Sequence, residues 1–130
     1  MVEGLAAFTD DSVLITEAEP LDPPGPRILW CNEAFERMTG YGSEEVLGRD
    51  PRFLQGPATD PAASARIGDG LRAWGPVREE ILNYRKDGTQ FWVDLSIRPV
   101  TDPSGFVLYW VSVQRDITEL KERELALQRR

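Results

Sequence analysis

Residues 77–116 constrain the fold most, because apolar and polar side chains alternate along them and turn sequences interrupt the alternation twice. In the central segment the apolar positions are Phe91, Val93, Leu95 and Ile97. A period of two is typical of a strand that buries one face. Asp87-Gly88 and residues 102–105 have hairpin-turn composition. The sequence therefore predicts an antiparallel meander of three strands over residues 77–85, 89–100 and 106–116.

The first half of the chain indicates short strands and short helices. Residues 13–16 and 27–31 are apolar runs, and the segment between them contains four prolines and a glycine, which favours a loop. Asn32, Ser43 and Asp60 are suited to capping three helical segments. Residues 117–130, rich in Glu, Lys, Leu and Arg, predict a C-terminal helix. The fold class that follows is α+β.

Composition limits the function classes. A chain of 130 residues is long enough for one domain with a modest core. The net charge of −7 disfavours nucleic-acid binding, and the sequence has neither a bilayer-length apolar run nor a signal peptide, so we expect no membrane partner. One cysteine and no histidine indicate a reducing, cytoplasmic location and exclude imidazole metal sites and histidine-dependent triads. An enzyme is the least supported class.

Residues 48–56 read Gly-Arg-Asp-Pro-Arg-Phe-Leu-Gln-Gly. They resemble the Gly-x-Asn-Cys-Arg-Phe-Leu-Gln signature of LOV domains, the flavin-binding blue-light sensors of the PAS superfamily. Further matches occur in the family's order at residues 32–35, 39–41, 55–56, 59–61, 83–88 and 114–118. The resemblance implies a PAS fold, with a five-stranded antiparallel sheet, short helices on one face and a C-terminal exit helix. It divides the chain into a LOV-like domain, 1–116, and a linker or signalling helix, 117–130.

The resemblance also implies a cofactor, flavin mononucleotide (FMN), and seven residues that would bind it. They are Thr16, Asn32, Asp50, Arg52, Gln55, Asn83 and Gln114. Arg52 matches a phosphate-binding arginine, and Gln55 matches a glutamine on the ribityl and phosphate side. Asp50 stands where the family has asparagine, and its carboxylate can accept hydrogen bonds from ribityl hydroxyls.

The remaining matches surround the ring. Asn83 corresponds to an asparagine at the pyrimidine edge, and Gln114 to the glutamine that hydrogen-bonds flavin N5 and O4. Thr16 and Asn32 match positions lining the far side of the ring.

Several family positions hold other residues. Pro51 replaces the reactive cysteine, so the family's covalent photochemistry cannot occur there, and Cys31 is expected to be a packing residue. Gly68 replaces a second phosphate-binding arginine, and Val93 replaces a second edge asparagine. Arg66 is two residues from Gly68, roughly 200° around a helix, and should point elsewhere. If the losses add, affinity falls on the order of a hundred- to ten-thousandfold.

The last strand places apolar side chains on both faces. Trp110 is expected to face inward, where it could donate an electron to a flavin. Residues expected on the outer face are Tyr109, Val111 and Val113, with Trp92 on the neighbouring strand. This apolar row predicts a homodimer interface, because an identical patch is readily buried against its own copy. The alternative is that the exit helix folds back over the same row.

Two functions remain. The first is a cysteine-less LOV-like sensory module that binds a flavin noncovalently and relays a light or redox signal through its sheet and exit helix. The second is a cofactor-free PAS module for dimerisation and signal transmission. In both, the effector domain or partner is not specified by the sequence. A yellow protein absorbing blue light would favour the first, and a colourless protein the second.

Overall fold

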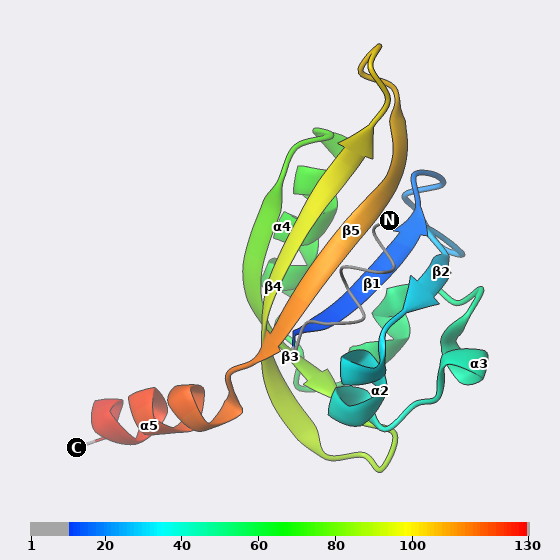
Figure 1. Ribbon diagram of the computed structural model, residues 1–130. Coiled ribbons are helices and arrows are strands. Elements are labelled where there is room, and N and C mark those ends of the chain that lie inside the picture. Colours follow the sequence, from blue (N-terminus) through cyan, green and yellow to red (C-terminus); the bar gives the residue numbers. More distant parts are fainter. Residues whose placement is uncertain (1–10, 130) are drawn as a thin grey trace.

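The computed structural model describes residues 11–129, which form one antiparallel five-stranded sheet with helices on one face (Figure 1). The strands are β1 (Ser12–Glu17), β2 (Ile28–Cys31), β3 (Val77–Tyr84), β4 (Gln90–Thr101) and β5 (Val107–Asp116). Their order across the sheet is β2-β1-β5-β4-β3. The predicted α+β PAS architecture is confirmed. Residues 1–10 of the predicted domain and residue 130 of the predicted helix lie outside the described residues.

The meander forms because both of its turns are closed locally. Gly88 and Gly105 have φ angles of 88° and 91°, which suit glycine because it has no Cβ. In the first turn the Asp87 carboxylate accepts a hydrogen bond from the Thr89 amide at 3.0 Å. In the second, Asp102 accepts from the Ser104 and Phe106 amides at 2.9 and 3.0 Å. The three strands lie within two residues of the predicted ranges.

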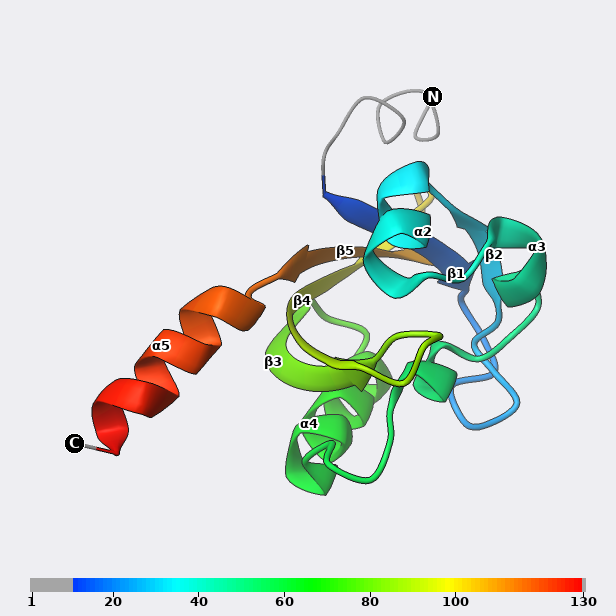
Figure 2. The ribbon, with the colours of Figure 1, turned by 90° about the horizontal axis from the view of Figure 1, so that it is seen from below.

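The helices are α2 (Glu33–Thr39), α3 (Ser43–Val46), the 3-10 helix η1 (Pro51–Leu54) and α4 (Pro61–Arg72). Asn32 and Asp60 cap α2 and α4 as predicted, each accepting a hydrogen bond from a first-turn amide. Ser43 was predicted to cap α3, but Gly42 occupies the cap position and its amide donates to Glu45. Figure 2 shows the curved sheet, with α4 near β3 and α2 and α3 near β1 and β2.

Two apolar clusters make up the core. One joins α4 to β3, β4 and β5 and includes Leu71, Ile81, Phe91 and Trp110. The other joins α2, α3 and η1 to β1 and β2 and includes Leu14, Phe35, Val46 and Leu54. Because both clusters pack on the inner face of the sheet, polar side chains on that face are buried rather than solvated.

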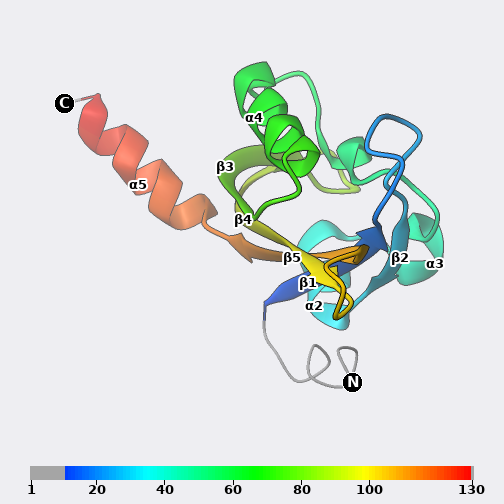
Figure 3. The ribbon, with the colours of Figure 1, turned by 90° about the horizontal axis from the view of Figure 1, so that it is seen from above.

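The C-terminal helix α5 (Thr118–Gln128) has no buried residue and leads away from the sheet (Figures 1 and 3). Its start is fixed to β4: the Ile117 amide donates to the Trp92 carbonyl at 2.9 Å, and the Trp92 amide donates to the Thr118 hydroxyl at 3.0 Å. The Lys121 ammonium lies 4.9 Å from the centre of the Trp92 ring. The helix therefore does not fold back over the outer row of β5. Within residues 11–129, no helix is both long and apolar enough to cross a membrane.

The outer face of β5 has the predicted side-chain pattern, since Tyr109, Val111 and Val113 are half-buried and alternate with buried residues. Val13 and Ile15 of β1 lie opposite Val113 and Val111 and continue the row. Trp92 is further away than the sequence indicates. It is four positions along β4 from Ser96, the partner of Val113, and lies beneath Lys121.

Candidate functional site

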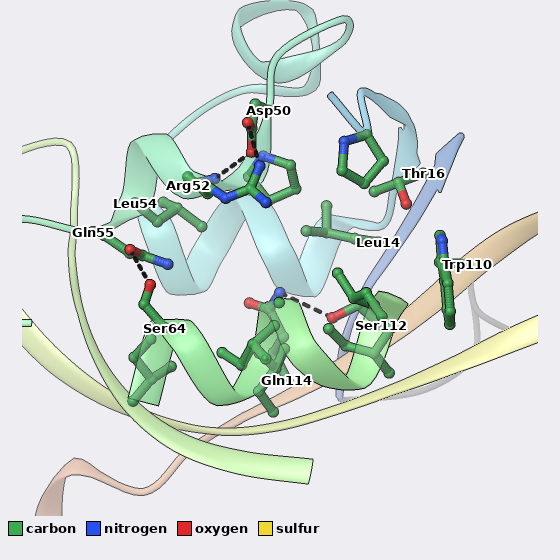
Figure 4. A pocket seen from close by; sticks show the side chains of 18 of the residues that line it. Leu14, Thr16, Asp50, Arg52, Leu54, Gln55, Ser64, Trp110, Ser112 and Gln114 are labelled. Carbon is green, nitrogen blue, oxygen red and sulfur yellow. Dashed lines mark hydrogen bonds and ion pairs between the residues drawn. The ribbon is translucent and has the colours of Figure 1, made fainter. Parts of the chain in front are cut away.

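A cavity of about 100 Å³ lies between the inner face of the sheet and helices η1 and α4 (Figure 4). Its walls are mainly apolar, and its polar lining residues come from five elements and from the two residues that flank η1. Six of the seven predicted cofactor-binding residues line it: Thr16, Asp50, Arg52, Gln55, Asn83 and Gln114. Side chains from distant parts of the sequence therefore meet in one enclosed space.

Asn32, the seventh predicted residue, is not among the residues lining this cavity. Its side-chain oxygen accepts hydrogen bonds from the amides of Val13 and Phe35, both at 3.0 Å, and its nitrogen donates to the Asp11 carbonyl at 2.8 Å. It thereby links the start of α2 to β1. The cap was foreseeable from sequence, whereas the bonds to β1 depend on tertiary packing.

Two buried side-chain amide oxygens indicate which kind of ligand the cavity can bind. Asn83 Oδ1 on β3 and Gln114 Oε1 on β5 have no hydrogen-bond partner among the described residues, and the two residues are 7% and 4% exposed. A buried acceptor without a donor costs about 1–3 kcal/mol. Buried polar atoms are normally paired, so two orphans lining one cavity point to a ligand that supplies N–H or O–H donors.

Gln114 is partly fixed by its own strand. Its Nε2 donates to the Ser112 hydroxyl at 3.2 Å, which directs the unpaired Oε1 elsewhere (Figure 4). Ser112 faces inward two residues before Gln114 and is buried. Ser112 is not among the predicted binding residues. Its position two residues from Gln114, on the same face of the strand, could have indicated that it lines the cavity.

Asp50 and Arg52 form a compact ion pair at another side of the cavity (Figure 4). Arg52 Nη1 donates to Asp50 Oδ2 at 2.7 Å and to the Gly25 carbonyl at 2.9 Å, and Nη2 donates to the Leu21 carbonyl at 2.8 Å. Asp50 Oδ1 also caps η1 by accepting from the Arg52 amide at 2.9 Å. The guanidinium is therefore bound to a carboxylate and to the loop that joins β1 to β2.

Gln55 and Ser64 continue the polar lining, with the Ser64 hydroxyl donating to Gln55 Oε1 at 2.6 Å. Ser64 is another lining residue that sequence reasoning missed. Its position one turn before Gly68, on the same side of α4, could have indicated that it lines the cavity.

Three positions on α4 decide whether it presents a positive charge. Gly68, where the LOV resemblance implies a phosphate-binding arginine, lines the cavity. Arg66 binds Glu79 at 2.7 Å and is not a lining residue, so the expectation that it points elsewhere is confirmed. Arg72 was not foreseen: its Nη1 lies 3.2 Å from where a Cβ on Gly68 would be. Helical side chains lean toward the N-terminus, which brings residue 72 over residue 68.

Trp110 forms one wall of the cavity and is 1% exposed, which confirms that it faces inward. Its Nε1 donates to the Ala18 carbonyl at 3.1 Å. Its ring stacks on that of Trp74, with centroids 5.6 Å apart and planes 13° from parallel. Trp74 is 38% exposed and has a φ of 58°. The pair connects the cavity wall to the surface.

Pro51, at the first position of η1, lines the cavity and carries no nucleophile. Cys31 is buried in the cluster beneath α2 and is not a lining residue. Burial, with smaller effects of the Glu36 and Glu44 carboxylates, raises the pKa of its thiol to about 11. The thiol therefore stays protonated near neutral pH, away from the cavity.

Comparisons with known proteins agree with this geometry. A family profile described as PAS domain matches residues 10–119. A solved structure titled "Flavin Analogue Sheds Light on Light-Oxygen-Voltage Domain Mechanism" is 34% identical, with a TM-score of 0.83, covering 98% of this chain and 92% of that one. The LOV domain of the blue-light-activated histidine kinase of Erythrobacter litoralis EL346 is 38% identical, with a TM-score of 0.75, over 83% of this chain and 96% of that one. The chain belongs to the PAS domain family and, within it, to the LOV domains.

A full-length relative places such a domain in a larger protein. The blue-light-activated histidine kinase of Rhizobium johnstonii is 44% identical over 112 residues, which is 86% of this chain and 32% of the kinase. The chain spans a third or less of the first curated relatives that it matches.

Proposed function

We propose that this LOV domain binds a flavin noncovalently and relays a light or redox signal through its sheet and α5, without forming a cysteinyl adduct. The observation that carries the proposal is the pair of amide oxygens, on Asn83 and Gln114, that have no partner among the described residues in a mainly apolar cavity. The pyrimidine edge of a flavin combines an N–H donor with carbonyl acceptors, while the rest of its ring is flat and apolar. The Asn83 oxygen can accept from this N–H, and the Gln114 amide, once turned away from Ser112, can donate to a ring acceptor.

The residues present fit the ring of a flavin better than its phosphate. Asn83 and Gln114 would hold the edge, and Leu54, Leu95 and Trp110 would pack on the ring. The cavity is comparable with engineered apolar cavities of about 150 Å³ that accept benzene. A three-ring ligand is larger, so lining side chains must move apart when it binds.

When bound, a flavin supplies blue-light absorption and can accept electrons. The chain contributes Trp110 in the cavity wall as a candidate electron donor. It offers no thiol there, because position 51 is proline and the protonated Cys31 lies elsewhere. These features support a response without a covalent bond.

Gln114 is suited to passing a change to the exit helix. It lies two residues before Asp116, whose carboxylate accepts hydrogen bonds from the Thr118 amide at 2.9 Å and from Arg85 at 3.0 Å. A rotation of the Gln114 amide would alter the end of β5 and so the start of α5. We infer that α5 leads to an effector, as its relatives carry the matched domain within histidine kinases.

The test is an absorption spectrum of the protein purified with excess flavin and freed of unbound ligand. We expect a yellow protein with a structured blue-absorption band. Asn83→Leu should weaken binding about 5- to 150-fold, the equivalent of 1–3 kcal/mol. Gln90→Leu, at an exposed amide on β4 outside the cavity, is the matched control and should bind as the parent does. A colourless parent at all flavin concentrations would instead favour the cofactor-free dimerisation module.

A further inference from the structure

We propose that this cavity selects a flavin without a phosphate, of the riboflavin type, over FMN. The inference rests on the proposed function and concerns the end of the cavity opposite Asn83 and Gln114, whose amide oxygens are unpaired within residues 11–129. There the two charged side chains that line the cavity, among the described residues, are Asp50 and Arg52, and they neutralise each other.

The donors of Arg52 are largely committed. Both hydrogens of Nη1 are used, by Asp50 Oδ2 and the Gly25 carbonyl, and Nη2 holds the Leu21 carbonyl. A phosphate monoester carries about −1.5 to −2 charges near neutral pH. To reach this guanidinium it must approach a carboxylate whose side chain is only 16% exposed, or displace it. Poor solvation strengthens the repulsion between the two anions.

A second arginine near the site is also balanced by acids. Arg72, whose guanidinium lies over Gly68, pairs with Asp22 at 3.4 Å and Asp69 at 3.3 Å. Asp22 belongs to the same β1–β2 loop whose carbonyls Arg52 holds. Both arginines therefore contact this loop. The pairs of Arg72 are exposed and weak, so the main obstacle to a phosphate is the Asp50 carboxylate at Arg52.

A neutral polyhydroxyl chain meets no such conflict. On that side the lining offers the Ser64 hydroxyl and the amide of Gln55. These groups both donate and accept, and the Asp50 carboxylate accepts from hydroxyls. The same residues that repel a phosphate are therefore compatible with a ribityl chain.

The experiment compares riboflavin and FMN by equilibrium titration with the full chain, following flavin fluorescence at low and at physiological ionic strength. We expect riboflavin to bind at least threefold more tightly, with the difference shrinking as salt screens the repulsion. Asp50→Asn removes the charge, and its amide oxygen can still cap η1. It should tighten FMN binding tenfold or more and change riboflavin binding less than twofold. Glu33→Gln, a fully solvated acid-to-amide change on α2, should alter neither.

A second variant covers the case in which Asp50→Asn fails to fold. Gly68→Arg adds a cation at the cavity edge. Its Cβ would meet only the flexible end of Arg72, at 3.2 Å. It should strengthen FMN binding alone. Tighter binding of FMN than of riboflavin by the parent, or an equal response of both ligands to these variants, would overturn the selectivity while leaving flavin binding intact. Binding of neither flavin would refute the proposed function and this inference together.

Discussion

Replacing Gln114 with leucine, together with Ser112→Ala, should change stability and flavin affinity in opposite directions. In the ligand-free protein the substitution removes Oε1, a buried acceptor with no partner among the described residues, which costs the parent about 1–3 kcal/mol. It also removes the 3.2 Å hydrogen bond to Ser112, worth about 0.5–1.5 kcal/mol. The balance predicts a double variant between about 0.5 kcal/mol less stable and about 2.5 kcal/mol more stable than the parent, with Ser112→Ala included so that no hydroxyl is left unpaired.

Flavin affinity, in contrast to stability, should fall in the variant. A flavin that donates to or accepts from the Gln114 amide loses that bond in the variant, which lowers affinity about 5- to 150-fold. The assay is urea unfolding without flavin, followed by flavin titration of the same samples. Gln90→Leu serves as control in both measurements. A variant that loses more than about 1 kcal/mol of stability while binding flavin like the parent would show that the amide is a structural group, and the reasoning would fail.

Four further predictions concern Pro51, Cys31, Val93 and Val111. Strong blue light should not bleach the flavin-loaded chain reversibly with a new violet band, because Pro51 has no thiol; such bleaching in the intact chain would contradict the noncovalent mechanism. Cys31 keeps its proton to about pH 11 when folded but only to about pH 9 when unfolded, so the folded state binds more protons between these values and stability falls as pH rises. Relative to Cys31→Ala, the parent's free energy of unfolding should fall by roughly 2–3 kcal/mol between pH 8 and pH 11, as measured by urea unfolding at each pH. The same pH dependence in both proteins would contradict this prediction. Val93→Asn should tighten riboflavin and FMN equally, since the LOV resemblance implies an edge asparagine at this position; Val93 itself is buried in the core cluster and does not line the cavity, and a preference for FMN alone would argue against an edge position. Val111→Arg should convert a dimer to a monomer in light scattering, because it places a charge within the outer row; Leu108→Arg is the control, and a parent that is monomeric at high micromolar concentration would refute dimerisation through this face.

The parts of the fold that the sequence predicted are those fixed by neighbouring residues. Asp87 and Gly88 close a turn within three positions, and Asn32 and Asp60 accept hydrogen bonds from amides two or three residues ahead. The alternation in β4 reports burial directly, since one of its faces meets the core. These interactions need no knowledge of the rest of the chain.

What the sequence could not predict depends on contacts between distant segments. Arg52 occupies the expected position, yet its partners Leu21 and Gly25 lie 31 and 27 residues earlier, so its commitment to a loop has no local signal. The stacking of Trp74 on Trp110 joins the end of α4 to β5. The same is true of Trp92, whose covering by Lys121 depends on the direction in which α5 leaves the sheet.

The two ends of the cavity depart from the LOV pattern in different ways, and the difference bears on whether the cavity is filled. At the phosphate end, charge has been balanced within the chain, so the ligand-free protein carries no unmet charge there. At the ring edge, Asn83 and Gln114 remain as amides with unpaired oxygens, and together they cost about 2–6 kcal/mol. Domains are usually stable by only about 5–15 kcal/mol, and leucine at either position would remove the penalty. A module that only dimerised would gain stability by losing both amides. Their presence supports the proposal of a bound ligand that pairs with them, and the neutralised opposite end supports the proposal that this ligand lacks a phosphate.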